Sequence, residues 1–68
     1  MDTKTIDNNF TYHSPKDGQP EMYQCIRDCA KALAYTINEF TPDGREKSLA
    51  MTKLEETVMW ANAGIARG

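Results

Sequence analysis

The fold of this chain is decided by one stretch near its end, Ser48-Leu-Ala-Met-Thr-Lys-Leu-Glu-Glu-Thr-Val-Met-Trp-Ala-Asn-Ala-Gly-Ile-Ala-Arg67. Its apolar residues recur at steps of three and four, which places them on one face of an α-helix. These residues are Met51, Leu54, Val58, Ala61 and Ile65. Gly64 costs a helix about 1 kcal/mol relative to alanine, which indicates either crowding there or a glycine tolerated near a fraying end. No proline interrupts the stretch, so it predicts one amphipathic helix whose apolar face other residues must cover.

A second stretch upstream shows the same apolar spacing. Pro20 suits the first position of a helix, and Glu21 favours the positive end of the helix dipole. From there the apolar residues again recur at steps of three and four, which is the spacing of a helix-packing seam. They are Tyr23, Ile26, Ala30, Leu33, Ile37 and Phe40. The pattern predicts a helix over residues 20–41.

The connection between the two predicted helices is very short, Thr41-Pro-Asp-Gly44. Pro42 blocks propagation of the first helix. Asp43 is predicted to cap the second helix, with Glu46 at capping-box spacing, so that this helix spans residues 43–67. Because so short a connection leaves little freedom, the two helices should be antiparallel neighbours.

The residues before the first long helix form a polar arm, residues 1–19. Thr3 or Asp7 is predicted to cap a short N-terminal helix or turn. The segment Phe10-Thr-Tyr-His-Ser-Pro15 is predicted to be extended, because residues before a proline avoid the helical region. The chain is therefore predicted to be a single all-α domain, residues 1–68, built as a helical hairpin with this arm before it.

Length and composition narrow the class of protein. The chain has 68 residues, a net charge of −2 and 40% hydrophobic residues, which is typical of one soluble globular domain. No apolar run approaches the roughly 18 residues of a membrane span, and the polar N-terminus does not resemble a signal peptide. We therefore expect a cytoplasmic protein with no membrane partner. A hairpin this small buries little apolar surface, so we expect copies of the chain to associate.

The two cysteines, Cys25 and Cys29, lie four residues apart. On a helix they share a face, but this geometry suits a disulfide poorly. We interpret them as small, half-buried residues in a reducing compartment. His13 is the only histidine, so a metal site would lack ligands, and we predict no metal or other cofactor.

The residues favour binding of a small anion over catalysis. The chain has no glycine-rich phosphate loop, no paired-histidine motif and no nucleophile with a credible base, so we predict that it is not an enzyme. Tyr12 and Trp60 could stack on a nucleobase. The negative net charge and the absence of a basic run disfavour long nucleic acid. The cations that could hold phosphates are Arg27, Lys31, Arg45, Lys53 and Arg67.

Three segments together resemble one known family. The stretch Arg45-Glu-Lys-Ser-Leu-Ala-Met-Thr-Lys-Leu-Glu-Glu-Thr-Val-Met-Trp-Ala-Asn-Ala-Gly-Ile-Ala-Arg67 strongly resembles the short phage proteins that act as anti-CBASS cyclic-oligonucleotide sponges. Residues 10–15 and 23–31 fit the same family. The resemblance implies a helical hairpin with a short N-terminal helix, assembled into a ring-like homohexamer. It implies immune evasion in the cytoplasm of the infected bacterium. There the protein would sequester cyclic dinucleotides such as 3′,3′-cyclic GMP-AMP without cleaving them, and would hold cyclic trinucleotides at a second site.

The resemblance also implies residues for the cyclic-dinucleotide site. By matching position, Tyr12 stacks on a base, with His13 beside it in the aromatic motif. Arg27 stands where the family places a basic residue for phosphate, and Lys31 lies one helical turn further on. Cys29 occupies a position where the family pattern has a small polar residue such as threonine, so one hydrogen bond to the ligand differs here.

A different set of residues is implied for the cyclic-trinucleotide site. Arg67 is the principal candidate there, together with Arg45 and Ser48. Trp60 and Asn62 are interpreted as structural contacts between subunits.

Two other functions are compatible with the residues. A protein-interaction module without a nucleotide ligand would use the small residues of the last helix and Trp60 to dock on another protein. A nucleotide hydrolase is the third alternative, and incubation with cyclic dinucleotides followed by chromatography distinguishes it from a binding protein.

Overall fold

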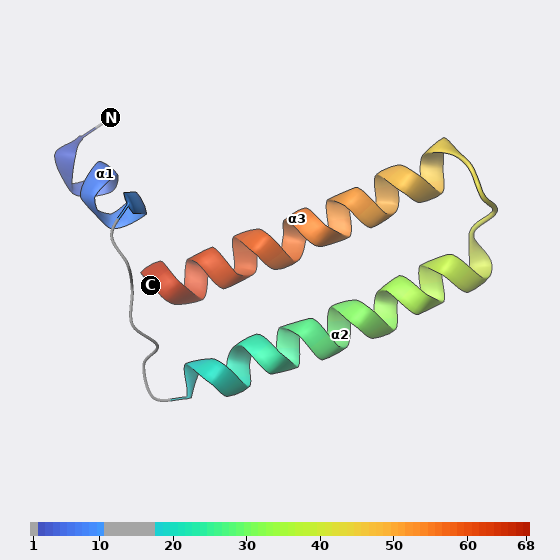
Figure 1. The fold of residues 1–68 in the computed structure, drawn as a ribbon, viewed down its shortest axis with the longest axis horizontal. Helices are drawn as coiled ribbons and strands as arrows, with labels where there is room; N and C mark the ends of the chain where they lie inside the picture. The colour runs from blue at the N-terminus through green and yellow to red at the C-terminus, as the bar shows by residue number, and fades with distance from the viewer. Residues whose placement is uncertain (1, 11–17) are drawn as a thin grey trace.

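Three α-helices make up the described part of the chain. The computed structural model describes residues 2–10 and 18–68. The helices are α1 (Thr3–Phe10), α2 (Gln19–Phe40) and α3 (Arg45–Arg67). Figure 1 shows α2 and α3 running antiparallel side by side, with α1 beyond the C-terminal end of α3. The predicted all-α architecture is confirmed for these residues.

Helix α2 begins and ends one residue earlier than predicted. Gly18 precedes it with a φ of 81°, a left-handed conformation that glycine adopts without strain. Pro20 lies in the first turn, where a missing N–H does no harm. At the other end, the Thr41 N–H donates to the Ile37 carbonyl at 2.9 Å. Thr41 itself is extended, as expected before a proline, so the helix stops at Phe40.

The start of α3 corrects the prediction at Asp43. The residue before this helix is Gly44, with a φ of 155°, and no side chain caps the helix. The Asp43 carboxylate instead accepts a hydrogen bond from Lys47 Nζ at 3.0 Å. Lys47 Nζ also donates to the Asn38 carbonyl at 3.0 Å, and its side chain is only 15% exposed. The predicted cap is wrong because Gly44, and not Asp43, stands at the N-cap position. Lys47, which sequence reasoning missed, binds the Asp43 carboxylate and ties the two helices together at the turn.

The cap of α1 is Asp2 rather than either predicted residue. The Thr5 backbone N–H donates to Asp2 Oδ1 at 2.8 Å, and this hydrogen bond lowers the pKa of the Asp2 carboxyl. Thr3 and Asp7 lie inside the helix, so their predicted capping role is wrong. Phe10 is the last residue of α1, which corrects its predicted extended conformation. The other residues of that predicted extended segment lie outside the described residues.

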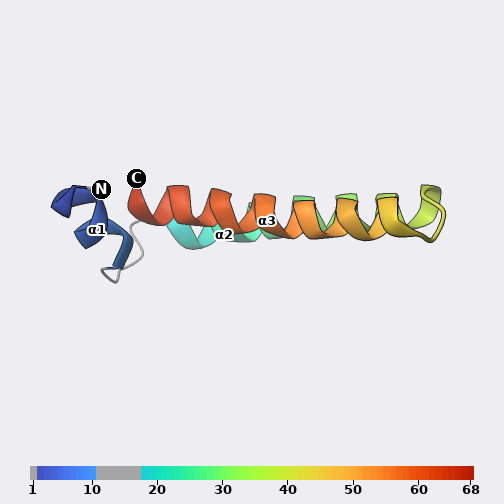
Figure 2. The ribbon, with the colours of Figure 1, turned by 90° about the horizontal axis from the view of Figure 1, so that it is seen from above.

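The hairpin is a single layer of helices. The shortest dimension of the molecule is 12 Å, about the diameter of one helix with its side chains. Figure 2 shows α2 and α3 lying at the same level. Domains bury their cores between two layers, and no hydrophobic side chain of the described residues is buried here. The large hydrophobic residues exposed in one copy are Ile6, Met22, Leu33, Tyr35, Phe40, Leu49, Met59 and Trp60.

Two predicted seam residues, Leu33 and Phe40, are exposed rather than turned toward α3. Residues spaced at strict steps of three and four shift by about 20° per heptad around a straight helix. Such a stripe therefore turns away from α3 along the length of α2. The remaining predicted seam residues of both helices are half-buried. Cys25 and Cys29 are exposed rather than half-buried, because a single layer leaves the flanks of α2 uncovered.

Gly64 shows no crowding within one copy of the chain. A Cβ built at this position meets no heavy atom within 4 Å outside the local helix backbone, and the residue is exposed. The alternative of a tolerated glycine therefore describes the single chain. Within the described residues, no helix combines the length and the apolar character that crossing a membrane requires.

The open end of the hairpin is closed by Gln19, which is the one buried residue among those described, at 7% exposure. Its Nε2 donates to the Ile65 carbonyl at 2.9 Å. The two residues lie 46 positions apart, so no local pattern in the sequence could have indicated this bond. It fixes the start of α2 against the end of α3.

Replacing Gln19 with alanine is expected to lower the free energy of unfolding by about 1 kcal/mol, the usual net contribution of a neutral hydrogen bond. Urea unfolding followed by circular dichroism measures the change. Gln24→Ala is the matched control, since Gln24 is an exposed amide on the same helix and its bonds stay within one turn. Equal destabilisation by both substitutions would contradict a special role for Gln19.

Candidate functional site

Two cations lie one helical turn apart on one side of the hairpin. Arg27 and Lys31 both belong to α2 and line an open groove of about 390 Å³ against α3. They are four positions apart on the helix, a rise of about 6 Å. Neither forms an ion pair with another described residue. The groove is completed by Ala30, Ala34, Leu54, Glu55 and Val58. Two positive charges thus border a mostly apolar floor, which suits a small anion with a flat apolar part.

A short chain of hydrogen bonds orients the guanidinium of Arg27. Arg27 Nη1 donates to Gln24 Oε1 at 3.1 Å, and Gln24 Nε2 donates to Asp28 Oδ1 at 2.7 Å. The direct partner of Arg27 is a neutral amide, so its charge is not neutralised by contact. A guanidinium has five N–H donors, and those not used here are available to phosphate oxygens.

One carboxylate, Glu55, lines the same groove from α3. Its negative charge repels a bound phosphate, and the repulsion falls with distance. An anion in this groove is therefore expected to lie toward the α2 side, close to Arg27 and Lys31.

Glu55→Gln is expected to tighten binding of a cyclic dinucleotide by up to about fivefold, since one exposed charge contact changes a free energy by roughly 0.2–1 kcal/mol. Calorimetric titration measures the affinity. Glu56→Gln removes the same charge from a residue that pairs with Lys53 at 3.4 Å and does not line the groove. If both variants gain equally, the effect is one of net charge and the placement of the anion is wrong.

Cys29 lies on the opposite side of the hairpin from the two cations. It is two residues from each of them, which corresponds to about 200° around a helix. Cys29 lines a separate groove of about 290 Å³ whose lining is almost wholly apolar. That lining also includes Cys25, Ile26, Ala30, Leu33, Leu54, Thr57 and Val58. One chain therefore does not bring Cys29 together with Arg27 and Lys31.

The residues predicted for the cyclic trinucleotide lie at opposite ends of α3. Arg45 is the first residue of the helix, Ser48 lies one turn further, and Arg67 is the last residue. Arg45 and Arg67 are separated by a rise of about 33 Å at 1.5 Å per residue. One chain does not bring Arg67 together with the other two. Arg67 stands in the last turn, where a cation is favoured by the helix dipole.

The structure describes only two of four further predicted residues, which are Tyr12, His13, Trp60 and Asn62. Tyr12 and His13 lie outside the described residues, so their roles stay predictions. Trp60 is 63% exposed in one copy. The buried Oδ1 of Asn62 has no hydrogen-bond partner among the described residues. Since an unsatisfied buried acceptor costs about 1–3 kcal/mol, Asn62 marks a place where a further hydrogen-bond donor would stabilise the protein.

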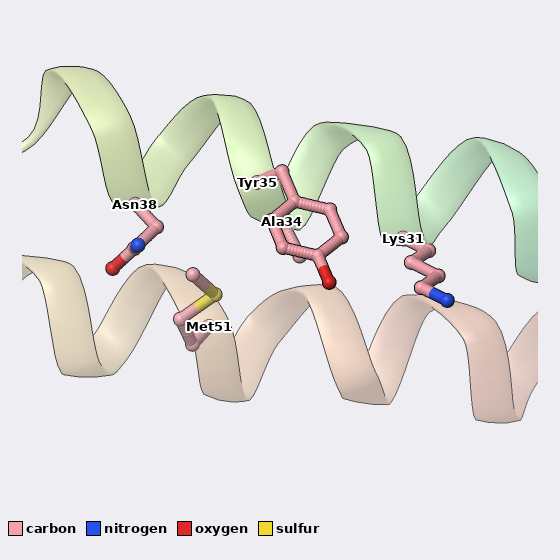
Figure 3. A pocket seen from close by; sticks show the side chains of 5 residues that line it. All are labelled: Lys31, Ala34, Tyr35, Asn38 and Met51. Carbon is pink, nitrogen blue, oxygen red and sulfur yellow. The ribbon is translucent and has the colours of Figure 1, made fainter.

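A third groove adjoins the groove lined by Arg27 and Lys31 and was missed by sequence reasoning. It has a volume of about 260 Å³ and shares Lys31 and Ala34 with the first groove. Figure 3 shows Lys31, Tyr35 and Asn38 extending from α2 toward α3, with Met51 rising from α3 between Tyr35 and Asn38. The signal was available in the sequence, because the three α2 residues follow one another at steps of four and three. The prediction used only the apolar spacing, which identifies the seam and not this row of polar residues.

The chemistry that these grooves offer is charge, hydrogen bonding and an aromatic surface. Among the described residues, no three potential metal-binding side chains of His, Cys, Asp or Glu cluster together. Both cysteine thiols are free and exposed. The arrangement supports reversible binding of an anion that carries flat groups.

One protein-family model matches the chain. It is described as Acb2/Tad1, hairpin domain, and it matches residues 1–66. The searches of the curated proteins and of the solved structures found no match. The matched region includes nearly the whole sequence and both helices of the hairpin.

Proposed function

Because the chain belongs to the Acb2/Tad1 hairpin-domain family of anti-CBASS sponges, we propose that it binds cyclic oligonucleotide second messengers and holds them intact. The observation that carries the proposal is the pair Arg27 and Lys31, two cations without an acidic partner on one groove of the hairpin. Charge-assisted hydrogen bonds to phosphate are among the strong contacts that a protein surface can offer. By sequestering the messenger in the infected bacterium, the protein would block CBASS signalling.

The cyclic-dinucleotide site is proposed to lie where copies of the chain meet. Arg27 and Lys31 would hold the phosphates, while Tyr12 and His13 would supply the aromatic contact. Cys29 lies on the other side of the hairpin, so it reaches the same ligand only if a second copy contributes it. This arrangement makes ligand binding depend on assembly.

Assembly of several copies, for which a hexamer is the proposed form, is supported by the shape of the single chain. A layer 12 Å thick leaves every apolar side chain within residues 2–7 and 18–68 at least partly exposed. Isolated helices and very small domains are marginal in water, so we propose that a second layer comes from other copies. The side of the hairpin with Cys25, Cys29 and Leu33 is the more apolar one and is the proposed packing surface.

A cyclic trinucleotide is proposed to bind at a second site around Arg67. The distance along α3 means that Arg45 and Ser48 can join Arg67 only from another copy. Arg67→Ala is expected to weaken a cyclic trinucleotide by roughly tenfold or more, since a bond to a charged group contributes about 1.5–3 kcal/mol. The same substitution should leave cyclic dinucleotides bound normally. Equal loss of both ligands in calorimetric titration would show that the two sites are not separate.

The decisive experiment titrates the purified protein with 3′,3′-cyclic GMP-AMP in a calorimeter and then denatures the complex with heat. Chromatography of the released nucleotide should show the intact cyclic form. Recovery of linear nucleotide would replace the sponge with an enzyme. Absence of binding across a panel of cyclic di- and trinucleotides would overturn the proposed function altogether.

A protein-interaction module is the second candidate, and Trp60 is the observation that favours it. An exposed tryptophan beside the exposed Met59 offers an apolar anchor for another protein. Light scattering distinguishes the two functions. A monomer that associates only after a different protein is added supports the module, whereas a preformed homo-oligomer supports the sponge.

A further inference from the structure

We propose that Tyr35 and Asn38 form a nucleobase subsite next to Lys31, so that a nucleotide with its phosphate on Lys31 stacks its base on the Tyr35 ring. The inference rests on the proposed function, and it names the part of the ligand that the groove of Lys31, Tyr35 and Asn38 recognises. The groove is lined by one aromatic ring, one amide and one cation over the side chains of Ala34 and Met51.

The ring of Tyr35 is placed as a stacking surface. The residue is 66% exposed, and Figure 3 shows its ring nearly face-on over the groove. Every nucleobase has a π-face, and aromatic side chains bind bases through that face. An aromatic residue held against the protein core would show a covered face, whereas this one leaves it open to a ligand.

Asn38 provides the hydrogen-bonding group of the subsite. It stands three residues after Tyr35, on the same side of α2, and its side chain extends into the groove. Its backbone carbonyl accepts from Lys47 Nζ, which anchors this turn of the helix. Its amide makes no hydrogen bond with another described residue. An amide presents one donor and one acceptor side by side, which matches the paired groups on the edge of a base.

Lys31 connects the subsite to the phosphate-binding groove. It lines both grooves, with Arg27 on one side and Tyr35 on the other. Lys31 and Tyr35 are four residues apart, a rise of about 6 Å. A phosphate and the base of the same nucleotide can therefore be held one helical turn apart. The two grooves together offer a continuous surface for charge at one end and a base at the other.

The test is calorimetric titration of 3′,3′-cyclic GMP-AMP into the full-length chain and its variants. Tyr35→Ala should weaken binding roughly 5- to 150-fold, the range measured for loss of a stacked base. Tyr35→Phe keeps the ring and should bind nearly as well as the unchanged protein. Tyr35→Leu keeps apolar volume without a π-face, and its loss of binding with normal helix content separates stacking from folding. Asn38→Ala should weaken binding roughly 2- to 13-fold.

Two controls make the result specific. Phe40→Ala removes an exposed ring of the same helix that lines neither groove, and it should leave binding unchanged. The salt dependence of binding should stay the same in Tyr35→Leu, because the phosphate contacts remain, and should fall in Lys31→Ala. If the unchanged protein binds the ligand and Tyr35→Leu binds it equally well, the subsite is wrong while the proposed function stands. If the unchanged protein binds no cyclic nucleotide, both the proposed function and the subsite that rests on it are wrong.

Discussion

Arg27→Ala is expected to weaken the binding of 3′,3′-cyclic GMP-AMP by roughly 10- to 150-fold, because hydrogen bonds to a charged group contribute about 1.5–3 kcal/mol. Arg27 lines the cation groove, and its nearest side-chain partner is the neutral amide of Gln24. Removing its guanidinium therefore removes a contact with the ligand without leaving a carboxylate unpaired. Helix content and oligomeric mass should stay unchanged, since Arg27 does not line the apolar groove that is proposed as the packing surface.

The controls for Arg27 separate a specific phosphate contact from a change in net charge. Lys53→Ala removes one positive charge from an exposed residue. Lys53 lines neither the groove of Arg27 nor that of Tyr35, so the substitution should change the affinity only slightly. Arg27→Lys keeps the charge but loses the planar fork of donors, so its affinity should fall between those of Arg27→Ala and the unchanged protein. Equal affinity of Arg27→Ala and Lys53→Ala would show that the phosphates bind elsewhere.

Leu33→Asp is expected to dissociate the assembly and to unfold much of the hairpin. Leu33 is 49% exposed in one copy and lines the apolar groove with Cys25 and Cys29. If copies pack through this surface, the substitution removes about 1.5–3 kcal/mol of apolar burial from every copy and adds a charge that must be desolvated. Light scattering should report a smaller mass, and circular dichroism should report helix content that falls on dilution.

Ala32→Asp is the matched control for the assembly surface. Ala32 is exposed, lines none of the three grooves, and follows Asp28 by four residues, on the outer edge of α2 away from α3. The Ala32→Asp substitution introduces the same side chain one position before Leu33 but outside the apolar groove. It should therefore leave the oligomeric mass and the helix content nearly unchanged. A stable, fully helical Leu33→Asp oligomer would place the packing surface on another face of the hairpin.

Local patterns in the sequence predicted the helices well and predicted their ends less well. The apolar spacing located α2 and α3, and Pro42 placed the break between them. The capping predictions at Thr3, Asp7 and Asp43 were wrong. Several residues near a helix start have side chains capable of capping. Which of them does so depends on the backbone of the turn, as Asp2 and Gly44 show.

The structure likewise brings together only some of the residues predicted for the candidate site. Sequence reasoning selected Arg27 and Lys31, and the structure places them together on one groove. It also selected Cys29, Arg45 and Arg67, which one chain does not bring together. Lys31, Tyr35 and Asn38 also follow one another at steps of four and three. Because these residues are polar, the apolar pattern that located the helices did not include them.

By itself, the sequence determined two long helices, the short turn between them, the absence of a core large enough for one chain, and the family resemblance. Those features follow from residues close together in the chain, whose spacing and turn chemistry act locally. Only the tertiary structure decided which flank of α2 faces α3, so that the cations line one groove and the thiols another, and that Gln19 bonds to Ile65. The reason is that α2 can rotate about its axis without changing its own hydrogen bonds. The flank that it turns toward α3 is set by contacts between residues far apart in the sequence.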